Sequence, residues 1–175
     1  MARKNLEAGL GLDGEEFERF HAGTATGLWA YLRRLGGDPD LADDVLQESY
    51  VKFLNYVDPS SEEREKRGYL YRIATNLMRD RWRRDRRERL GLSWLFGRWQ
   101  EPGRDGTVSV RMDLEAVFSR LEPRERAILW LAYVEEYDHR EIAGIVGVKE
   151  GSVRVLLFRA RKKAARELGR KEVSS

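Results

Sequence analysis

The sequence predicts an all-α protein made of two small helical domains joined by a linker. Three observations predict this class. Apolar residues recur at three- and four-residue spacing in both halves, a glycine-containing segment separates the halves, and no strand-like alternation of useful length appears. A chain of 175 residues can be divided into two such domains. We place them at residues 13–90 and 113–169, with the linker at 91–112.

The composition excludes several classes of protein. Lys and Arg total 33 against 30 for Asp and Glu, so the arrangement of charge matters more than the net +3. Cysteine is absent, which excludes disulfides, cysteine nucleophiles and thiolate zinc sites, and we expect no metal and no cofactor. No apolar run approaches the roughly 20 residues of a membrane span, and the N-terminus lacks a signal-peptide core. We expect a soluble cytoplasmic protein without membrane insertion.

The first two helices are predicted from their apolar faces and their breaks. The first spans Glu15 to Leu35, and Gly36, Gly37 and Pro39 end it. Asp40 is predicted to cap the second helix. The apolar face of the first helix comprises Phe17, Phe20, Leu28, Tyr31, Leu32 and Leu35, and that of the second comprises Leu41, Val45, Tyr50, Phe53 and Leu54.

A loop from Val57 to Arg67 and a third helix from about Gly68 complete the first half. The buried face of this helix is predicted to hold Leu70, Ile73, Ala74, Leu77 and Trp82.

The linker and the following helices are predicted from glycine, proline and apolar spacing. Trp94, Leu95, Phe96 and Trp99 make the linker too apolar for a solvated tether, so we expect it to dock on a domain or on a partner. A short helix should carry Leu114, Val117, Phe118 and Leu121. Pro123 should open the next, with Ile128, Leu129, Leu131 and Ala132.

The strongest local pattern is a helix-turn-helix in the C-terminal domain. Asp138 and Glu141 fit a capping box, Gly147 supplies the turn, and a second helix begins near Lys149. The second helix of such a motif enters the major groove of DNA. Between Lys149 and Lys171 nine basic residues stand against two acidic ones, which suits DNA phosphates. The alternative is a solvated basic helix end.

A second basic element runs from Arg79 to Arg89 and holds seven arginines and three acidic residues. Aromatic, amide and guanidinium groups on one helix stripe suit single-stranded nucleic acid. The alternative is an exposed helix with ion pairs such as Asp80 to Arg84. The stripe comprises Tyr69, Arg72, Asn76, Arg79 and Arg83.

An acidic face is predicted on the second helix, where Asp44, Gln47 and Glu48 point to solvent while Val45 and Tyr50 point elsewhere. Negative charge repels DNA phosphate, so this face suits a basic protein partner. Helix capping and the helix dipole explain the same first-turn acids without a partner.

Together these segments resemble the extracytoplasmic-function (ECF) branch of the sigma-70 family from about Asp13 to Leu168, with a gap at the linker. DLADDVLQESYVKF is similar to the family's polymerase-binding helix, and GYLYRIATNLMRDRWRR to its −10 reader. The resemblance assigns core-polymerase contacts to Asp44, Gln47, Glu48 and Tyr50. It assigns −10 DNA contacts to Tyr69, Arg72, Asn76, Arg79, Asp80 and Arg83. It assigns −35 DNA contacts to Lys149, Ser152, Arg154, Val155, Arg159 and Arg161.

The resemblance implies a sigma factor that binds the clamp of the largest RNA polymerase subunit, the flap of the second, and promoter DNA in duplex and single-stranded form. It also implies an anti-sigma partner, and a flipped −10 base in the loop from Val57 to Arg67. The recognition helix usually has Ser and Arg where this chain has Val155 and Leu156. Base readout is then expected from thymine methyl contacts or DNA shape, or Val155 contacts a partner instead.

Two other classes of function, a DNA-binding regulator and an enzyme, are alternatives to a sigma factor. A dimeric helix-turn-helix regulator could bind an operator, with the first half as a sensor or dimerisation module. It would leave the arginine-rich helix and the acidic face without a role. An enzyme is the third hypothesis. His21 and His139 are the only histidines and have no metal-ligand spacing, and no phosphate loop or nucleophile elbow is present. We therefore predict that the chain is not an enzyme.

Overall fold

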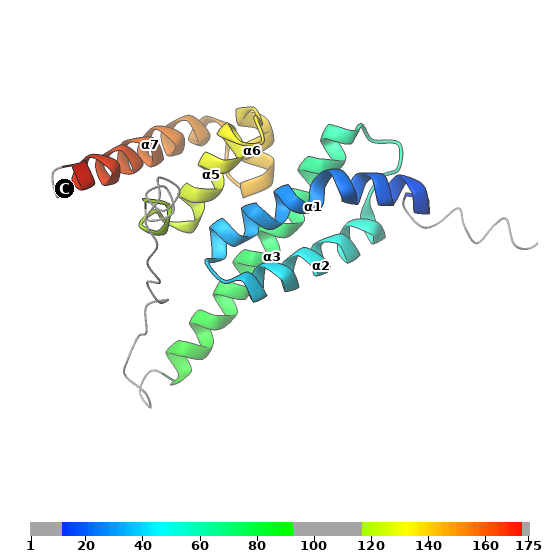
Figure 1. Cartoon of the computed structure of the whole chain (residues 1–175), viewed down its shortest axis with the longest axis horizontal. Helices are drawn as coiled ribbons and strands as arrows, with labels where there is room; N and C mark the ends of the chain where they lie inside the picture. The colour runs from blue at the N-terminus through cyan, green and yellow to red at the C-terminus, as the bar shows by residue number, and fades with distance from the viewer. Residues whose placement is uncertain (1–11, 93–116, 173–175) are drawn as a thin grey trace, which may run out of the picture.

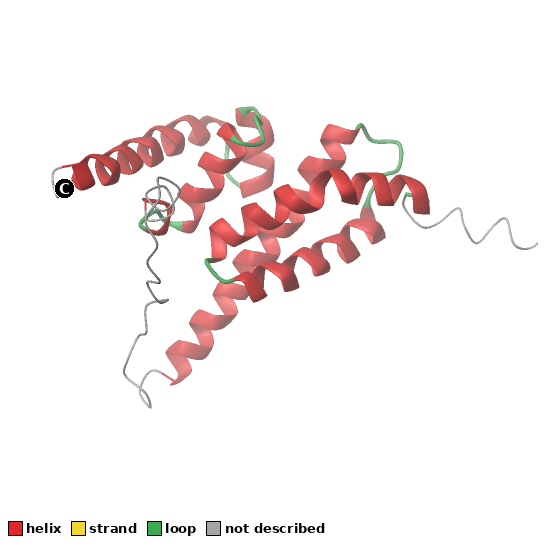
Figure 2. Cartoon of the chain, in the orientation of Figure 1, coloured by secondary structure: helices red, strands yellow, loops and turns green. Residues whose placement is uncertain are grey.

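The computed structural model describes residues 12–92 and 117–172, and within them it contains helices and no strand (Figure 2). The predicted all-α class is confirmed. The first two residues of the predicted linker, 91 and 92, belong to the last turn of α3. The rest of the linker, with Trp94 and Trp99, and Leu114 of the predicted short helix lie outside the described residues, and the domain boundaries stay predictions. Residues 117–119 form a short helical turn. The longer helices are α1 (Gly14–Gly36), α2 (Pro39–Tyr56), α3 (Glu63–Leu92), α5 (Pro123–Tyr133), α6 (His139–Val146) and α7 (Glu150–Glu172) (Figure 1).

The cap of α2 differs from the prediction. Asp38, not Asp40, caps this helix, and its carboxylate accepts hydrogen bonds from the backbone N–H of Asp40 at 2.9 Å and of Leu41 at 3.4 Å. Pro39 occupies the first turn, where a missing N–H costs nothing because no intrahelical acceptor exists there. Asp40 instead adds negative charge to the first turn.

The start of α3 also differs from the prediction. The helix begins at Glu63 rather than near Gly68, so the loop before it covers only residues 57–62. Glu63 and Glu65 stand in the first turn, where carboxylates stabilise the positive end of the helix dipole, so a polar sequence still forms helix here. In the loop, the Asp58 carboxylate accepts hydrogen bonds from the hydroxyl and N–H of Ser60, which lower its pKa.

The hydrophobic core is continuous through both halves of the chain. In Figure 1, α5 lies beside α1, and contacts also join α6 to α3. Leu41, Leu54, Ile73 and Trp82 were predicted to be buried but are only partly so. Core residues on α3 that the apolar pattern missed are Tyr71, Thr75 and Met78, which the second half and α1 help to cover.

The helix-turn-helix forms as predicted. Asp138 and Glu141 complete a capping box at the start of α6, and Gly147 ends α6 with a left-handed φ of 68°. Glycine adopts this conformation without the steric cost that a Cβ would add. Val153 and Leu157 of α7 are buried against the rest of the second half. The turn therefore presents the opposite face of α7 to solvent.

Candidate nucleic-acid and polymerase interfaces

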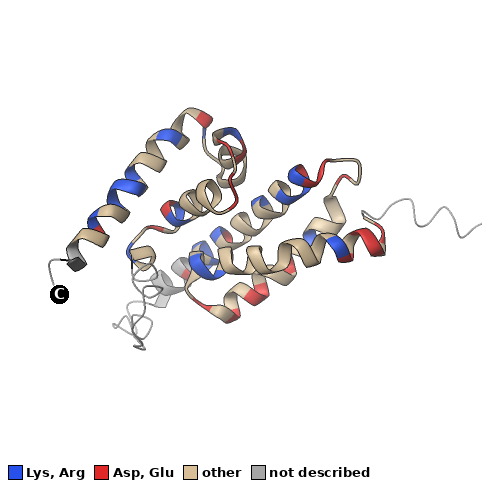
Figure 3. Ribbon diagram, turned by 45° about the horizontal axis from the view of Figure 1, so that its top comes forward, with Lys and Arg blue, Asp and Glu red and all other residues tan. Residues whose placement is uncertain are grey.

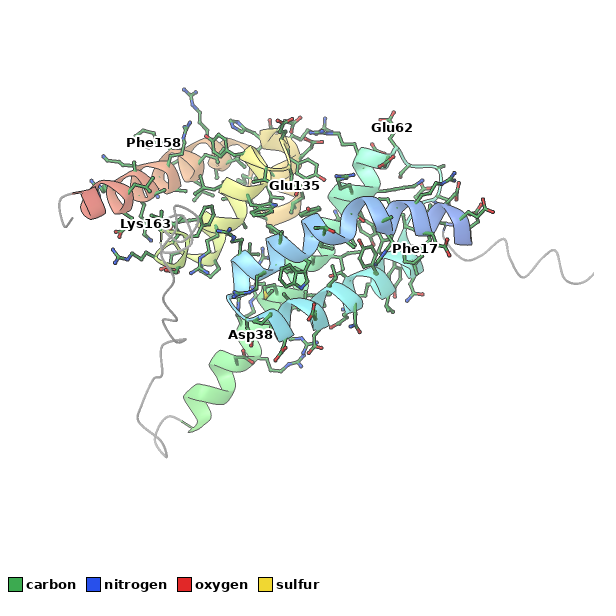
Figure 4. The ribbon with its side chains drawn as sticks, in the orientation of Figure 1. Phe17, Asp38, Glu62, Glu135, Phe158 and Lys163 are labelled. Atoms are coloured by element: carbon green, nitrogen blue, oxygen red, sulfur yellow. The ribbon has the colours of Figure 1, made fainter. Side chains whose placement is uncertain are left out.

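The exposed face of α7 carries the residues predicted to contact the −35 element, except Lys149, which directly precedes the helix. Within it the Val155 side chain is 47% exposed, and Phe158, one turn further along, is 58% exposed. Figure 4 shows Phe158 on the outer side of α7. Helical spacing from Val155 places Phe158 on the same face, but its apolar side chain is not part of the basic pattern that predicted the DNA contacts. The exposed predicted residues are Lys149, Ser152, Arg154, Val155, Arg159 and Arg161.

A groove of about 770 Å³ lies between the start of α6 and this face of α7. Arg154 and Arg161 line its α7 side, and Arg140 comes from α6. The Arg161 guanidinium donates a hydrogen bond to the Tyr133 hydroxyl at 3.2 Å, which holds it at the groove. Two acidic residues, Asp138 and Glu150, also line the groove, so arginines outnumber acids there. This excess of guanidinium groups suits an anionic backbone such as that of DNA.

The α3 stripe is exposed over most of its length. Figure 3 shows basic residues along α3 and α7. The Tyr69 ring is half-buried, and the Arg72 guanidinium lies over it at 5.0 Å from its centroid. Asp80 pairs with Arg83 at 3.8 Å, three residues away, instead of with Arg84 as the ion-pair alternative predicted. The exposed residues among the predicted −10 contacts are Arg72, Asn76, Asp80 and Arg83.

Arg79 differs from the rest of the stripe. Its side chain is partly buried, and Nη2 donates a hydrogen bond to the carbonyl oxygen of Val146 at 2.8 Å. Nη1 lies 3.6 Å from the position of a Cβ on Gly147. Arg79 therefore faces the second half of the chain in this conformation, and not the solvent.

On α2, Asp44 and Gln47 are exposed and Glu48 is partly exposed. Burial alone would raise the pKa of Glu48, but hydrogen bonds from Arg81 at 2.9 Å and from Lys52 lower it. The carboxylate is therefore an anion at neutral pH. Asp44, Gln47 and Glu48, called the acidic face below, stand on one side of the helix.

Tyr50 does not belong to the acidic face. Its side chain is only 6% exposed, and its hydroxyl lies 2.6 Å from the Thr24 hydroxyl inside the core. The His21 ring packs against it with the centroids 4.6 Å apart and the ring planes tilted by 51°. Tyr50 supports α2 against α1, and in this conformation it offers no surface to a polymerase.

The described residues contain no group of His, Asp and Glu side chains arranged to hold a metal ion. His21 and His139 lie on different helices of different halves. No helix in the described part of the chain is long and apolar enough to cross a membrane.

Two family models match the chain. The sigma-70 region 2 model matches residues 24–88, and the sigma-70 region 4 model matches residues 111–163. These ranges contain the acidic face, the α3 stripe and the helix-turn-helix. The fold and the two matched regions define a sigma factor of the sigma-70 class.

Relatives and solved structures agree with this class. ECF RNA polymerase sigma factor SigE of Mycolicibacterium smegmatis is 33% identical over 156 residues, which cover 84% of this chain and 58% of that protein. RNA polymerase sigma factor CnrH of Cupriavidus metallidurans is 32% identical over 133 residues, with 69% and 70% covered. The chain belongs to the extracytoplasmic-function sigma factors of the sigma-70 family. Sigma factors are transcription initiation factors, and the comparisons do not favour the dimeric operator-binding alternative.

Two structures share the fold. Sigma factor RpoE from Bartonella quintana, solved with the anti-sigma factor NepR, matches with a TM-score of 0.71 at 19% identity and covers 89% of this chain and 98% of that one. CnrH, solved with the cytosolic domain of CnrY, matches with a TM-score of 0.61 at 25% identity and covers 90% of each chain.

Proposed function

We propose that this chain directs core RNA polymerase to specific promoters and aids DNA melting there, acting in the cytoplasm and contributing no catalysis of its own. One observation carries the proposal. A helix-turn-helix with an exposed basic recognition helix stands in one chain with an arginine-rich stripe and an acidic face. Duplex DNA, unpaired DNA and a basic protein surface each have a chemically suited partner on this molecule.

The acidic face is proposed to dock on the clamp of the largest polymerase subunit, through Asp44, Gln47 and Glu48. The second half is proposed to lie near the flap of the second subunit. Docking holds both DNA readers on one rigid body, which raises their effective concentration at a promoter. The free chain should therefore bind promoter duplex weakly.

At the −35 element, we assign Lys149, Ser152, Arg154, Arg159 and Arg161 to phosphate and polar contacts. Val155 is assigned to base readout, because an apolar side chain in the major groove contacts the thymine methyl group. At the −10 element, Tyr69 is assigned to stacking on an unpaired base, since aromatic rings stack on bases of any sequence. The remaining −10 contacts are assigned to Arg72, Asn76, Arg79, Asp80 and Arg83.

The test is run-off transcription by core RNA polymerase on promoter templates, with this chain added or omitted. Defined start sites should appear only when it is present. Asp44→Arg should abolish binding to core polymerase in a pull-down, whereas Arg154→Ala should retain core binding and lose starts that depend on the −35 element. Glu18→Arg, a charge reversal on exposed α1, is the matched control and should behave as wild type. Start sites that are the same with and without the chain would overturn the proposal.

We also propose an anti-sigma partner, supported by the two sigma factors that were solved with anti-sigma proteins. Such a partner should compete with core polymerase for this chain. Co-purification from native cells before induction should return it. If only polymerase is recovered under inducing and non-inducing conditions alike, this part of the proposal is wrong.

A further inference from the structure

One member of the acidic face is already bonded inside the protein. The side chains of Asp44 and Gln47 are exposed and have no partner among the described residues. The Glu48 carboxylate differs from them. Its Oε2 accepts a hydrogen bond from Nη2 of Arg81 at 2.9 Å, and its Oε1 lies 3.2 Å from the ammonium of Lys52. This proposed polymerase contact therefore lies between two cations.

The two cations differ in the helix that carries them. Lys52 follows Glu48 by four residues on α2, so this pair belongs to a single helix surface. Arg81 comes from α3, which packs beside α2 (Figure 1). Arg81 therefore connects the Glu48 side chain to a second helix and restricts its orientation relative to both. A pair within one helix leaves more of that freedom, because the two long side chains can move together.

The packing of α2 on α3 does not depend on this ion pair. Both helices contribute buried apolar residues to one core, among them Val45, Phe53, Leu70, Ala74 and Leu77. The Arg81 side chain is 32% exposed and the Glu48 side chain is 35% exposed. An ion pair that water reaches contributes little to stability, because its charges are screened and its long side chains lose freedom. The main consequence of the bond is therefore the orientation of Glu48.

The bond leaves the Glu48 carboxylate able to accept a further donor. An ionised carboxylate has about four acceptor positions, and each oxygen of Glu48 faces one internal cation. Burial alone would raise the pKa of this carboxyl, but Arg81 and Lys52 lower it, so the group stays an anion. An ionised carboxylate held at the surface suits a guanidinium or an ammonium group of a partner.

We propose that Arg81 is a positioning residue for polymerase docking, which holds the Glu48 carboxylate in the orientation that the clamp binds. The inference rests on the proposed function, because it takes Glu48 as a polymerase contact. A long side chain loses freedom when it binds a partner, and a bond formed in advance removes part of that cost. Arg81 acts through Glu48, and we assign it no contact of its own with polymerase or DNA.

Arg81 also has an effect that opposes docking. Its positive charge offsets part of the negative charge of the acidic face, which weakens the attraction to a basic partner. That attraction acts over a distance and is screened beyond about 8 Å at physiological ionic strength. The orientation of a carboxylate acts at contact and depends much less on salt. We therefore expect the positioning effect to exceed the charge effect at an ionic strength of about 0.15 M.

Binding of the full chain to core RNA polymerase, measured without DNA, tests this role. Arg81→Met removes the charge and the donors but keeps an unbranched stem, and it should weaken binding about threefold to tenfold, the cost of ordering one long side chain. Arg81→Lys should recover most of the loss, because the bond to Glu48 uses one nitrogen. Arg84→Met, exposed on the same helix and outside the assigned contacts, is the matched control and should bind as wild type does.

A double-mutant cycle with Glu48→Ala separates positioning from a general effect on the fold. If Arg81 acts through Glu48, Arg81→Met should have no further effect on binding in the Glu48→Ala background. The melting temperature of Arg81→Met should stay within about 3 °C of wild type. If it falls further, Arg81→Gln, which keeps a polar side chain, replaces Arg81→Met in the cycle. An equal loss in both backgrounds would overturn the positioning role, and so would tighter binding by Arg81→Met than by wild type.

The inference and the proposed function fail in different ways. If Glu48→Ala binds core polymerase as wild type does, the polymerase contact assigned to Glu48 is wrong, and the positioning role of Arg81 is wrong with it. If Glu48→Ala weakens binding and Arg81→Met does not, only the positioning role is wrong.

Discussion

The α7 face and the α3 stripe both present arginines, but the fold treats them differently. On α7, Arg154 and Arg159 are exposed and have no bond to another described residue. On α3, Arg79 bonds to Val146 and Arg81 bonds to Glu48. The proposed −35 contacts are thus available in the structure as it stands, whereas Arg79 of the proposed −10 contacts is bonded to Val146.

The largest expected effect comes from the α7 face. Arg154→Ala combined with Arg159→Ala should lower run-off transcription from a duplex promoter by roughly tenfold to a hundredfold, because two of the proposed phosphate and polar contacts are lost together. Promoter affinity should also fall less steeply with rising salt in the variant than in wild type, because fewer phosphates are neutralised. A template whose −10 region is already unpaired should recover much of the activity. An equal loss on both templates would place these arginines outside −35 recognition.

The next effect concerns the α3 stripe. Tyr69→Ala should lower open-complex formation by about tenfold, the value of one stacked base. Tyr69→Trp should retain activity, because the larger ring also stacks. Permanganate footprinting of unpaired thymines measures the open complex directly. If alanine and tryptophan at this position behave alike, stacking is not the role of Tyr69.

A smaller effect distinguishes the two ways in which Val155 could act. If Val155 contacts a thymine methyl group, replacing that thymine by deoxyuridine should weaken −35 binding by the holoenzyme about fourfold, the value of one buried methyl group. Val155→Ala should remove the difference between the two bases. An unchanged difference in the variant would favour a partner contact for Val155.

The smallest expected effect is the pH dependence of the contact between α3 and α6. The hydrogen bond from Arg64 holds the pKa of Glu141 below its ordinary value of 4.5 in the folded protein. A depressed pKa stabilises the folded state above the ordinary value, and this stabilisation is lost as the pH falls through the depressed one. The melting temperature of the chain should therefore decline below about pH 4.5, and Arg64→Ala should weaken that decline. A pH response that is unchanged in Arg64→Ala would assign it to other groups.

Local features were predictable from the sequence, and contacts between the halves were not. The capping box at Asp138 and the glycine at the turn of the helix-turn-helix depend on neighbours within a few residues, so spacing alone identified them. The positions of Arg79 and Tyr71 depend on α6 and Glu135, more than 60 residues away along the chain. A helical stripe placed Arg79 among exposed residues because periodicity carries no information about which distant surface covers it.

Tyr50 illustrates the same limit in the family resemblance. The motif placed it among the polymerase contacts, while its spacing on the helix already placed it away from the acidic face. Its burial against Thr24 agrees with the position that helical spacing predicts, and not with the surface contact that the family motif implies.

The predicted start of α3 was wrong for another reason. Polar first turns stabilised by carboxylates contain no apolar period to detect.

The most direct test of the whole account is start-site mapping with core polymerase and this chain on a library of promoter fragments. We predict start sites that share an upstream and a downstream sequence element at constant spacing. Arg154→Ala should relax only the upstream preference, and Asn76→Ala only the downstream one. The account would be contradicted if the chain bound a single palindromic element without polymerase. It would also be contradicted if both variants gave the same start sites as wild type.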